Sequence, residues 1–312
     1  MTEIPPAFPG GSVSCYSIVA RDPVRGELGV AVQSYWFSVG TLVPWAEAGV
    51  GAVASQGFSD GSYGVVGIDR MRAGQGAPDV LRDLLAADPG RERRQVAMVD
   101  AGGGVAAHTG AGCFVVAGHL VGEGFAVQSS MVRTEAVWVA MAQAYAETEG
   151  SLAGRLLAAL DAAEAAGGEL RGRRSAALIV VPAISSGRPW LDRIYDVRVD
   201  DNPEPLVELR RLVGLRTAYN LMGTAQLLLE KGDLEGALRK SLDAGAMCPD
   251  NPETVFWPAV ILVLAGRLDE ALPLFRKTFR LHPSWVEMAR GLPAVGLLPD
   301  DPALLARILA QA

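Results

Sequence analysis

Six short runs of small and β-branched residues recur through the first two thirds of the chain, each bounded by turn-forming residues. Their length and composition are typical of β-strands. Because both faces of most runs are apolar, the sheets that they form need a cover on each side. Apolar spacings of three and four predict helices near residues 62–73, 77–86, 134–147 and 151–166, which would supply that cover. We therefore expect an α+β domain built as a four-layer αββα sandwich. The runs are YSIVA, LGVAVQS, VGAVAS, QVAMVD, FAVQSS and AALIVV.

The last third of the chain repeats itself at an offset of 34 residues, so that Gly232 matches Gly266 and Ala237 matches Ala271. This period is typical of tetratricopeptide repeats, which are pairs of helices. Glycine fits the turn between two helices, and alanine lets two helices approach closely. We expect two repeats, at 218–251 and 252–285, and a capping helix in the remaining tail.

A change in composition separates the two parts. Lysine is absent from residues 1–230 and then occurs at Lys231, Lys240 and Lys277. The sequence predicts an N-terminal extension over residues 1–13, an α+β domain over 14–202, a linker helix over 203–217 and a tetratricopeptide-like all-α domain over 218–312.

Charge and composition narrow the classes of partner. The net charge of −7 and the lack of a dense run of lysine or arginine argue against nucleic acid. No apolar stretch is long enough to span a bilayer, and the first residues, MTEIPPAFPGG, lack the basic start and apolar core of a signal peptide. We expect a cytoplasmic protein without a membrane partner.

The sequence offers no pattern for a metal or a cofactor. Cys15, Cys113 and Cys248 are odd in number and far apart, so they suggest neither a disulfide framework nor a zinc cluster. His108 and His119 flank Cys113 at spacings that match no compact set of metal ligands. Phosphate-binding glycine motifs are missing as well. We expect neither a metal nor a cofactor.

Several separated stretches, in order, resemble the DUF1028 family over about residues 14–210. They include CYSIVARDPVRGELGVAVQSYWFSVG, AGHLVGEGFAVQSSM and YDVRVDDNPEP. The family is placed by its fold among the N-terminal nucleophile (Ntn) hydrolases, whose nucleophile is the first residue of the mature chain. Relatives commonly have threonine in a segment like TFSIVA, and Cys15 stands at that position here. The resemblance implies a hydrolase of small amides whose nucleophile is Cys15, with its own α-amine as base, after cleavage behind Ser14.

Two features depart from the pattern of the proteasome-like Ntn hydrolases. Those enzymes use an acid at the end of the second strand, where this chain has Gln33, and a buried lysine, which this domain lacks. We therefore take polar residues near the strand ends as candidates for substrate binding. They are Gln33, Ser34, Gln56, Gly57, Asp60, Gln128, Ser129 and Ser130.

Two functions from different classes remain open at this point. One is an Ntn-type hydrolase that acts on a small amide substrate. The other is a non-catalytic protein that binds a small ligand or serves as a scaffold on an Ntn-like fold, in which Cys15 is a buried core residue at the start of a strand. In both cases the helical repeats suit a protein partner or homo-oligomerisation.

Overall fold

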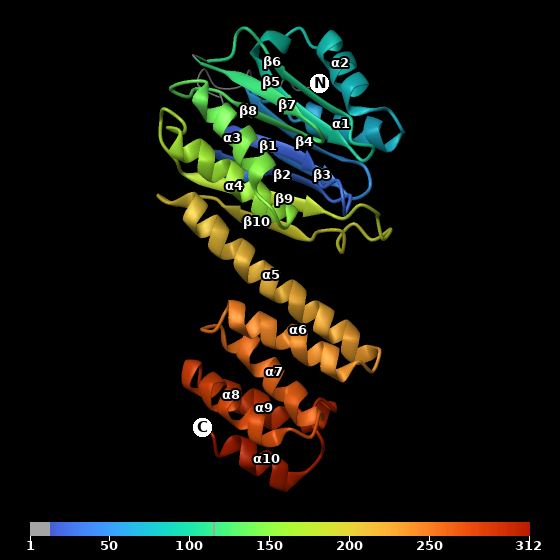
Figure 1. The fold of residues 1–312 in the computed structure, drawn as a ribbon, viewed down its shortest axis with the longest axis vertical. Coiled ribbons are helices and arrows are strands. Elements are labelled where there is room, and N and C mark those ends of the chain that lie inside the picture. Colours follow the sequence, from blue (N-terminus) through green and yellow to red (C-terminus); the bar gives the residue numbers. More distant parts are fainter. Residues whose placement is uncertain (1–12, 115) are drawn as a thin grey trace, which may run out of the picture. The chain divides into compact units, whose positions relative to one another are not determined.

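The structure is a computed structural model that describes residues 13–114 and 116–312. The expected extension therefore lies outside the described residues except for Val13. The chain forms two compact units, Met1–Arg211 and Leu212–Ala312, and each is described here by itself (Figure 1). The division falls within helix α5 (Pro205–Glu230). None of the helices in the described ranges is both long and apolar enough to cross a membrane.

The first unit contains two antiparallel sheets. In the larger sheet the strand order is β10-β9-β2-β1-β8-β7, and in the smaller one it is β3-β4-β5-β6. The larger sheet consists of β1 (Tyr16–Arg21), β2 (Leu28–Ser34), β7 (Gly118–Gly122), β8 (Phe125–Ser129), β9 (Ser175–Val181) and β10 (Tyr195–Val199). The smaller sheet consists of β3 (Pro44–Glu47), β4 (Gly51–Gly57), β5 (Arg94–Asp100) and β6 (Val105–Thr109).

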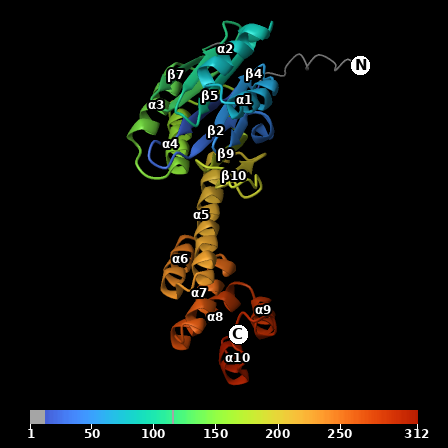
Figure 2. The ribbon, with the colours of Figure 1, turned by 90° about the vertical axis from the view of Figure 1, so that its right-hand side faces the viewer.

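Helices cover the outer face of each sheet (Figure 2). The smaller sheet packs against α1 (Ser62–Arg72) and α2 (Ala77–Ala87), and the larger against α3 (Ala136–Glu147) and α4 (Leu152–Ala165). The inner faces of the two sheets share one apolar core that includes Val30, Val32, Ala54 and Val99. All four helices expected from the sequence are confirmed, close to their predicted bounds.

Glycine sets the approach of α4 to the larger sheet. A Cβ atom at Gly29 would lie 2.8 Å from the Leu156 side chain, so a larger residue would push α4 away from β2. Two 3-10 turns, η1 (Val39–Thr41) and η2 (Arg91–Arg93), complete the first unit.

The second unit is helical. Besides the end of α5 it contains α6 (Leu234–Met247), α7 (Pro252–Leu264), α8 (Leu268–Leu281), α9 (Trp285–Gly291), η3 (Pro293–Val295) and α10 (Pro302–Leu309). Gly232 and Gly266 end α5 and α7 with positive φ angles of 79° and 74°. Similar backbone bonds close the two turns, from Asp233 N to Leu228 O (2.9 Å) and from Arg267 N to Leu262 O (2.8 Å). The sequence repeat thus corresponds to a repeated helix-ending turn.

Candidate functional site

Cys15 lies directly before the central strand β1 and is fully buried. Its carbonyl oxygen accepts hydrogen bonds from the backbone N–H of Ser130 (3.0 Å) and from Gln56 Nε2 (3.0 Å). Its thiol donates to the carbonyl oxygen of Val13 at 3.1 Å. The backbone at Cys15 is therefore held by both sheets, and its side chain belongs to the core between them.

Strand register separates the predicted residues into two groups. Tyr16 pairs with Gln33 on one side and Ser129 on the other, so these three side chains share a face. That face points toward α4, because the Tyr16 hydroxyl donates to Glu164 on that helix at 2.7 Å. Cys15 precedes Tyr16 and points to the opposite face. Gln33 and Ser129 therefore lie away from the thiol, and among the described residues their buried side-chain polar atoms have no hydrogen-bond partner.

The peptide carbonyl before Cys15 is held by two donors. The Ser14 carbonyl oxygen lies 2.6 Å from Ser34 Oγ and 3.2 Å from an Arg171 guanidinium nitrogen. Ser34 Oγ also lies 3.3 Å from a carboxylate oxygen of Glu169, and it hydrogen-bonds with the Cys15 thiol. One hydroxyl thus touches the thiol, the adjacent peptide carbonyl and a carboxylate.

Glu169 and Arg171 reach this site from the segment between α4 and β9. A β-bridge from Glu169 to Val132 fixes the backbone, and the Glu169 carboxylate accepts a hydrogen bond from Tyr35 N at 2.9 Å. The Glu169 side chain is fully buried and forms an ion pair with Arg171, which is partly exposed and lies over the Tyr35 ring. Arg171 and Tyr35 therefore form the side of the site nearest to solvent.

Burial dominates the protonation of these groups. It raises the pKa of the Glu169 carboxyl above its ordinary value, although Arg171, Tyr35 N–H and Ser34 partly offset the effect. It also raises the pKa of the Cys15 thiol well above the ordinary range, and the negative charge of Glu169 adds to this. In the uncleaved chain Cys15 is consequently a protonated thiol beside a buried acid.

A chain of buried amides joins β1 to the smaller sheet. Gln56 accepts from Ser17 Oγ (2.7 Å), and its Nε2 donates to Gln95 Oε1 (2.7 Å) as well as to Cys15 O. Gln95 in turn donates to the Ser129 carbonyl at 2.9 Å, and Gln128 donates to Ser17 at 3.1 Å. Gln56 therefore positions Cys15 directly. Gln128 links Ser17 to the Ala54 carbonyl (3.1 Å), and its Oε1 has no partner among the described residues.

Gly57 holds the segment that precedes Cys15. Its N–H donates to Val13 O (3.0 Å) and its carbonyl accepts from Val13 N (2.7 Å), as in a pair of antiparallel strands. Its φ angle of +81° favours glycine, and a Cβ atom there would lie 2.9 Å from the Arg93 carbonyl oxygen. Ser130 also adjoins Cys15 through its N–H, while its buried hydroxyl has no partner among the described residues.

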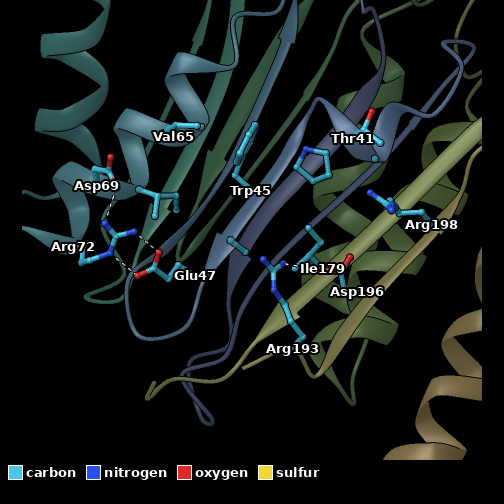
Figure 3. Close-up of a pocket in the computed structure, with 15 residues that line it drawn as sticks. Thr41, Trp45, Glu47, Val65, Asp69, Arg72, Ile179, Arg193, Asp196 and Arg198 are labelled. Carbon is cyan, nitrogen blue, oxygen red and sulfur yellow. Dashed lines mark hydrogen bonds and ion pairs between the residues drawn. The ribbon is translucent and has the colours of Figure 1, made fainter. Parts of the chain in front are cut away.

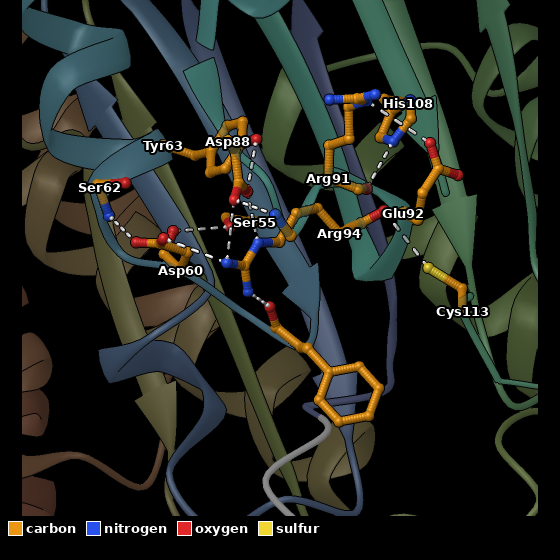
Figure 4. Close-up of polar contacts among 12 residues, drawn as sticks. Ser55, Asp60, Ser62, Tyr63, Asp88, Arg91, Glu92, Arg94, His108 and Cys113 are labelled. Atoms are coloured by element: carbon orange, nitrogen blue, oxygen red, sulfur yellow. Dashed lines mark hydrogen bonds and ion pairs between the residues drawn. The ribbon is translucent and has the colours of Figure 1, made fainter. Parts of the chain in front are cut away.

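Asp60 belongs to a different cluster. Figure 4 shows it beside Arg94, at 3.5 Å, together with Asp88, which pairs with Arg94 at 2.8 Å. Asp60 also accepts from the N–H of Ser62 at the start of α1. These contacts join the start of α1 to β5 and do not involve Cys15.

A wide cavity on the first unit lies away from Cys15. It has a volume of about 450 Å³ and lies among β3, α1 and β10 (Figure 3). Trp45 forms one wall, and the charges around it include Arg72, which is paired with Glu47 and Asp69. Neither Ser34 nor Arg171 lines this cavity. The described residues of its walls include no thiol and no histidine, so they offer no nucleophile of these kinds.

The two histidines of the first unit have ordinary partners. His108 Nε2 lies 2.9 Å from the Arg91 carbonyl, and His119 Nδ1 lies 2.8 Å from Thr109 Oγ1. Within residues 13–114 and 116–312, no three His, Cys, Asp or Glu side chains are grouped closely enough to hold a metal ion.

Reasoning from the sequence missed Glu169, Arg171 and Gln95. Glu169 and Arg171 lie in GGELRGR, a glycine-rich connection whose charges look like ordinary solvated loop residues. The one available signal was the position of an acidic residue shortly before the buried run AALIVV. Their approach to Cys15 depends on the pairing of distant segments, which spacing along the chain does not encode.

Comparison with known proteins gives a family and a structural relative. Residues 15–209 match the family of unknown function DUF1028. The crystal structure of SPO2555 from Silicibacter pomeroyi, also assigned to DUF1028, is 31% identical with a TM-score of 0.58, covering 64% of this chain and 84% of that chain. No curated protein matches this sequence. Because the family match spans more than half of the chain and begins at Cys15, this chain belongs to the DUF1028 family.

Proposed function

We propose that the first unit is an Ntn-type hydrolase of small amides and that Cys15 becomes its nucleophile after the Ser14–Cys15 bond is cleaved. The observation that carries this proposal is the pair of donors, Ser34 and Arg171, on the Ser14 carbonyl oxygen. Donors aimed at a carbonyl oxygen stabilise the negative charge that develops there when a nucleophile attacks. The αββα layers and the place of Cys15 at the start of a central strand support the same assignment.

In the first reaction the chain cleaves itself. Cys15 Sγ attacks the carbonyl carbon of Ser14, and its proton passes through the Ser34 hydroxyl to the Glu169 carboxylate. Ser34 gives its own proton to Glu169 as it takes the thiol proton, and its hydroxyl, now carrying that proton, holds the oxyanion together with Arg171. The C–N bond then breaks, the nitrogen of Cys15 takes the proton back from the Glu169 carboxyl through Ser34, and a thioester joins Ser14 to Sγ. Water hydrolyses the thioester, which releases the Ser14 carboxylic acid and restores the thiol.

In the mature protein the new α-amine of Cys15 serves as the base for its own thiol. Glu169 and Arg171 take the places of the acid and the lysine that the sequence lacks at the expected positions. Removal of Val13 and Ser14 also frees the backbone groups of Gly57 and the two donors. The acyl half of a substrate would bind there as an extended segment, with its carbonyl oxygen between Ser34 and Arg171.

The second unit serves, in this proposal, as a tetratricopeptide-like interaction module. The matching turns at Gly232 and Gly266 and the fully buried Ala237 and Ala271 support this interpretation. The surface of two repeats is small. In this proposal it binds either a protein partner or a second copy of this chain.

Trapping the thioester tests this mechanism. Freshly synthesised full-length protein is treated with hydroxylamine, and the products are identified by mass spectrometry. We expect the fragment 1–14 to be released as its C-terminal hydroxamate, and no release from a Cys15→Ala variant. Release of the same fragment from that variant would mean that another protease cuts the chain.

One observation favours the alternative, a non-catalytic ligand-binding protein. The Cys15 thiol is fully buried, its pKa is raised, and it already donates a hydrogen bond to Val13. A protein of this kind retains residues 1–14 and is unaffected by hydroxylamine. The trapping experiment therefore separates the two functions.

A further inference from the structure

A second cavity, of about 300 Å³, lies wholly within the helical unit, among α5, α6 and α7. This volume is at the lower end of the range of small-molecule sites, about 300–1,000 Å³. Most of its wall comes from apolar side chains on two helices. They are Met222, Ala225 and Leu229 on α5 and Trp257, Val260, Ile261 and Leu264 on α7.

The cavity exists because α7 is apolar on more than one face. One face packs into the core of the unit, where Phe256 contacts the ring of Phe275. Trp257, Ile261 and Leu264 follow one another at helical spacing on another face, and Leu264 is 45% exposed. A helix that is apolar all round is normally buried all round. Part of α7 is therefore left without a protein cover in this unit.

The cavity is lined by two polar side chains of α5 and α6, Gln226 and Ser241. Gln226 Nε2 already donates to Glu230 at 3.1 Å, so Ser241 is the one that lacks a partner. It lines the cavity from α6 and is 1% exposed, yet its hydroxyl has no hydrogen-bond partner among the described residues. A serine inside a helix can satisfy its hydroxyl by donating to the carbonyl four residues earlier, which would be Ala237, but no such bond is present here. A buried hydroxyl without a partner is unfavourable, so a ligand atom that accepts its hydrogen bond would gain affinity.

The described residues that line the cavity carry no ionisable group. A carboxylate or phosphate would therefore lose its hydration there without gaining an opposite charge. We propose that the cavity binds a neutral, apolar small molecule whose single hydrogen-bond acceptor bonds to Ser241. This site is independent of Cys15 and of the amide hydrolysis proposed above.

The test compares octan-2-one, which is neutral with one carbonyl acceptor, with octanoate, which is charged and of similar length. Binding to the full-length protein is measured by saturation-transfer NMR and by titration calorimetry. We expect octan-2-one to bind, and octanoate to bind at least about tenfold more weakly. Ser241→Ala should weaken binding of octan-2-one about three- to tenfold. Ser284→Ala, at an exposed serine of the same unit, should leave it unchanged.

A filled cavity provides the third comparison. Ala225 is 3% exposed and lines the cavity, so Ala225→Phe should abolish binding of octan-2-one. If circular dichroism shows that this variant does not fold, Leu264→Trp narrows the cavity from its exposed side instead. The proposal is overturned if the wild type does not bind octan-2-one, if octanoate binds as tightly, or if Ser241→Ala and the filled variant bind as the wild type does.

Discussion

The role of Ser34 in self-cleavage makes the sharpest prediction. Its hydroxyl lies 2.6 Å from the Ser14 carbonyl oxygen and contacts both the thiol and Glu169. Ser34→Ala removes one of two donors to the developing oxyanion and also the path for the thiol proton. Loss of one such donor lowers reaction rates by about 10²–10³, or about 2.7–4 kcal/mol of barrier. We expect self-cleavage to slow by at least this factor.

The same substitution also affects folding, because Trp36 N–H donates to Ser34 Oγ at 2.9 Å. Leaving that N–H without a partner costs about 1–3 kcal/mol of stability. Ser175→Ala is a matched control. Ser175 pairs with Ser34 across β2 and β9, is equally buried, and bonds to the backbone at Trp36 O (2.5 Å) and Val39 N (3.1 Å). These hydrogen bonds do not involve the Ser14 carbonyl.

The assay is cell-free synthesis of each full-length variant, followed by intact mass at timed intervals. Urea unfolding of each variant separates a slow reaction from an unfolded protein. The mechanism predicts slow cleavage in Ser34→Ala and a rate near that of the wild type in Ser175→Ala. It is refuted if Ser34→Ala cleaves at the wild-type rate, or if the two variants slow cleavage equally.

Three further predictions concern pH and stability. Glu169 must be ionised to take the thiol proton, and its pKa is raised. The cleavage rate, followed by intact mass at timed intervals, should therefore fall as the pH drops through a value above the ordinary Glu pKa of about 4.3. Glu169→Gln should remove this pH dependence. A non-glycine residue in the left-handed region costs roughly 1–2 kcal/mol of stability, and Gly57→Ala should cost more because its Cβ atom would also lie 2.9 Å from the Arg93 carbonyl oxygen. Gly74→Ala is the control: its φ angle is +94°, but its Cβ atom would have nothing within 4 Å, so its free energy of unfolding in urea should fall only by that amount. Burial raises the pKa of Asp88, but hydrogen bonds from Arg94, Gly90 and Tyr63 outweigh burial, so the pKa in the folded protein is below its ordinary value. The ionised carboxylate therefore stabilises the fold at pH values above the pKa of Asp88 in the unfolded chain, and this stabilisation is lost as the pH falls through its pKa in the folded protein. Asp88→Asn should therefore unfold at lower urea at neutral pH and show a shallower loss of stability in acid.

The interior of the first unit could be predicted from the sequence, and its edges could not. All six runs expected as strands form the inner strands β1, β2, β4, β5, β8 and β9, because burial on both faces leaves a continuous apolar run. The strands that the pattern missed, β3, β6, β7 and β10, are the edge strands of the two sheets. In β10, YDVRV, charged residues face solvent and break the run.

The candidate site shows the same division between local and distant information. The sequence singled out Cys15 and Ser34, which meet because the ends of β1 and β2 are paired. It did not show that Gln33 and Ser129 lie on the face of the sheet opposite to the Cys15 thiol. The alternation of side chains along a strand places successive residues on opposite faces, but it does not tell which of the two faces holds the site. Glu169 arrives through a bridge to Val132, a contact between segments that no periodicity connects.

The intact mass of the purified full-length protein, without an N-terminal tag and kept reduced, tests the central claim most directly. Wild type and Cys15→Ala are compared in one experiment. The proposed hydrolase predicts that the wild type has lost residues 1–14 and begins at Cys15, while the variant keeps them. If both proteins keep residues 1–14, cleavage before Cys15 does not occur and the N-terminal nucleophile mechanism is contradicted.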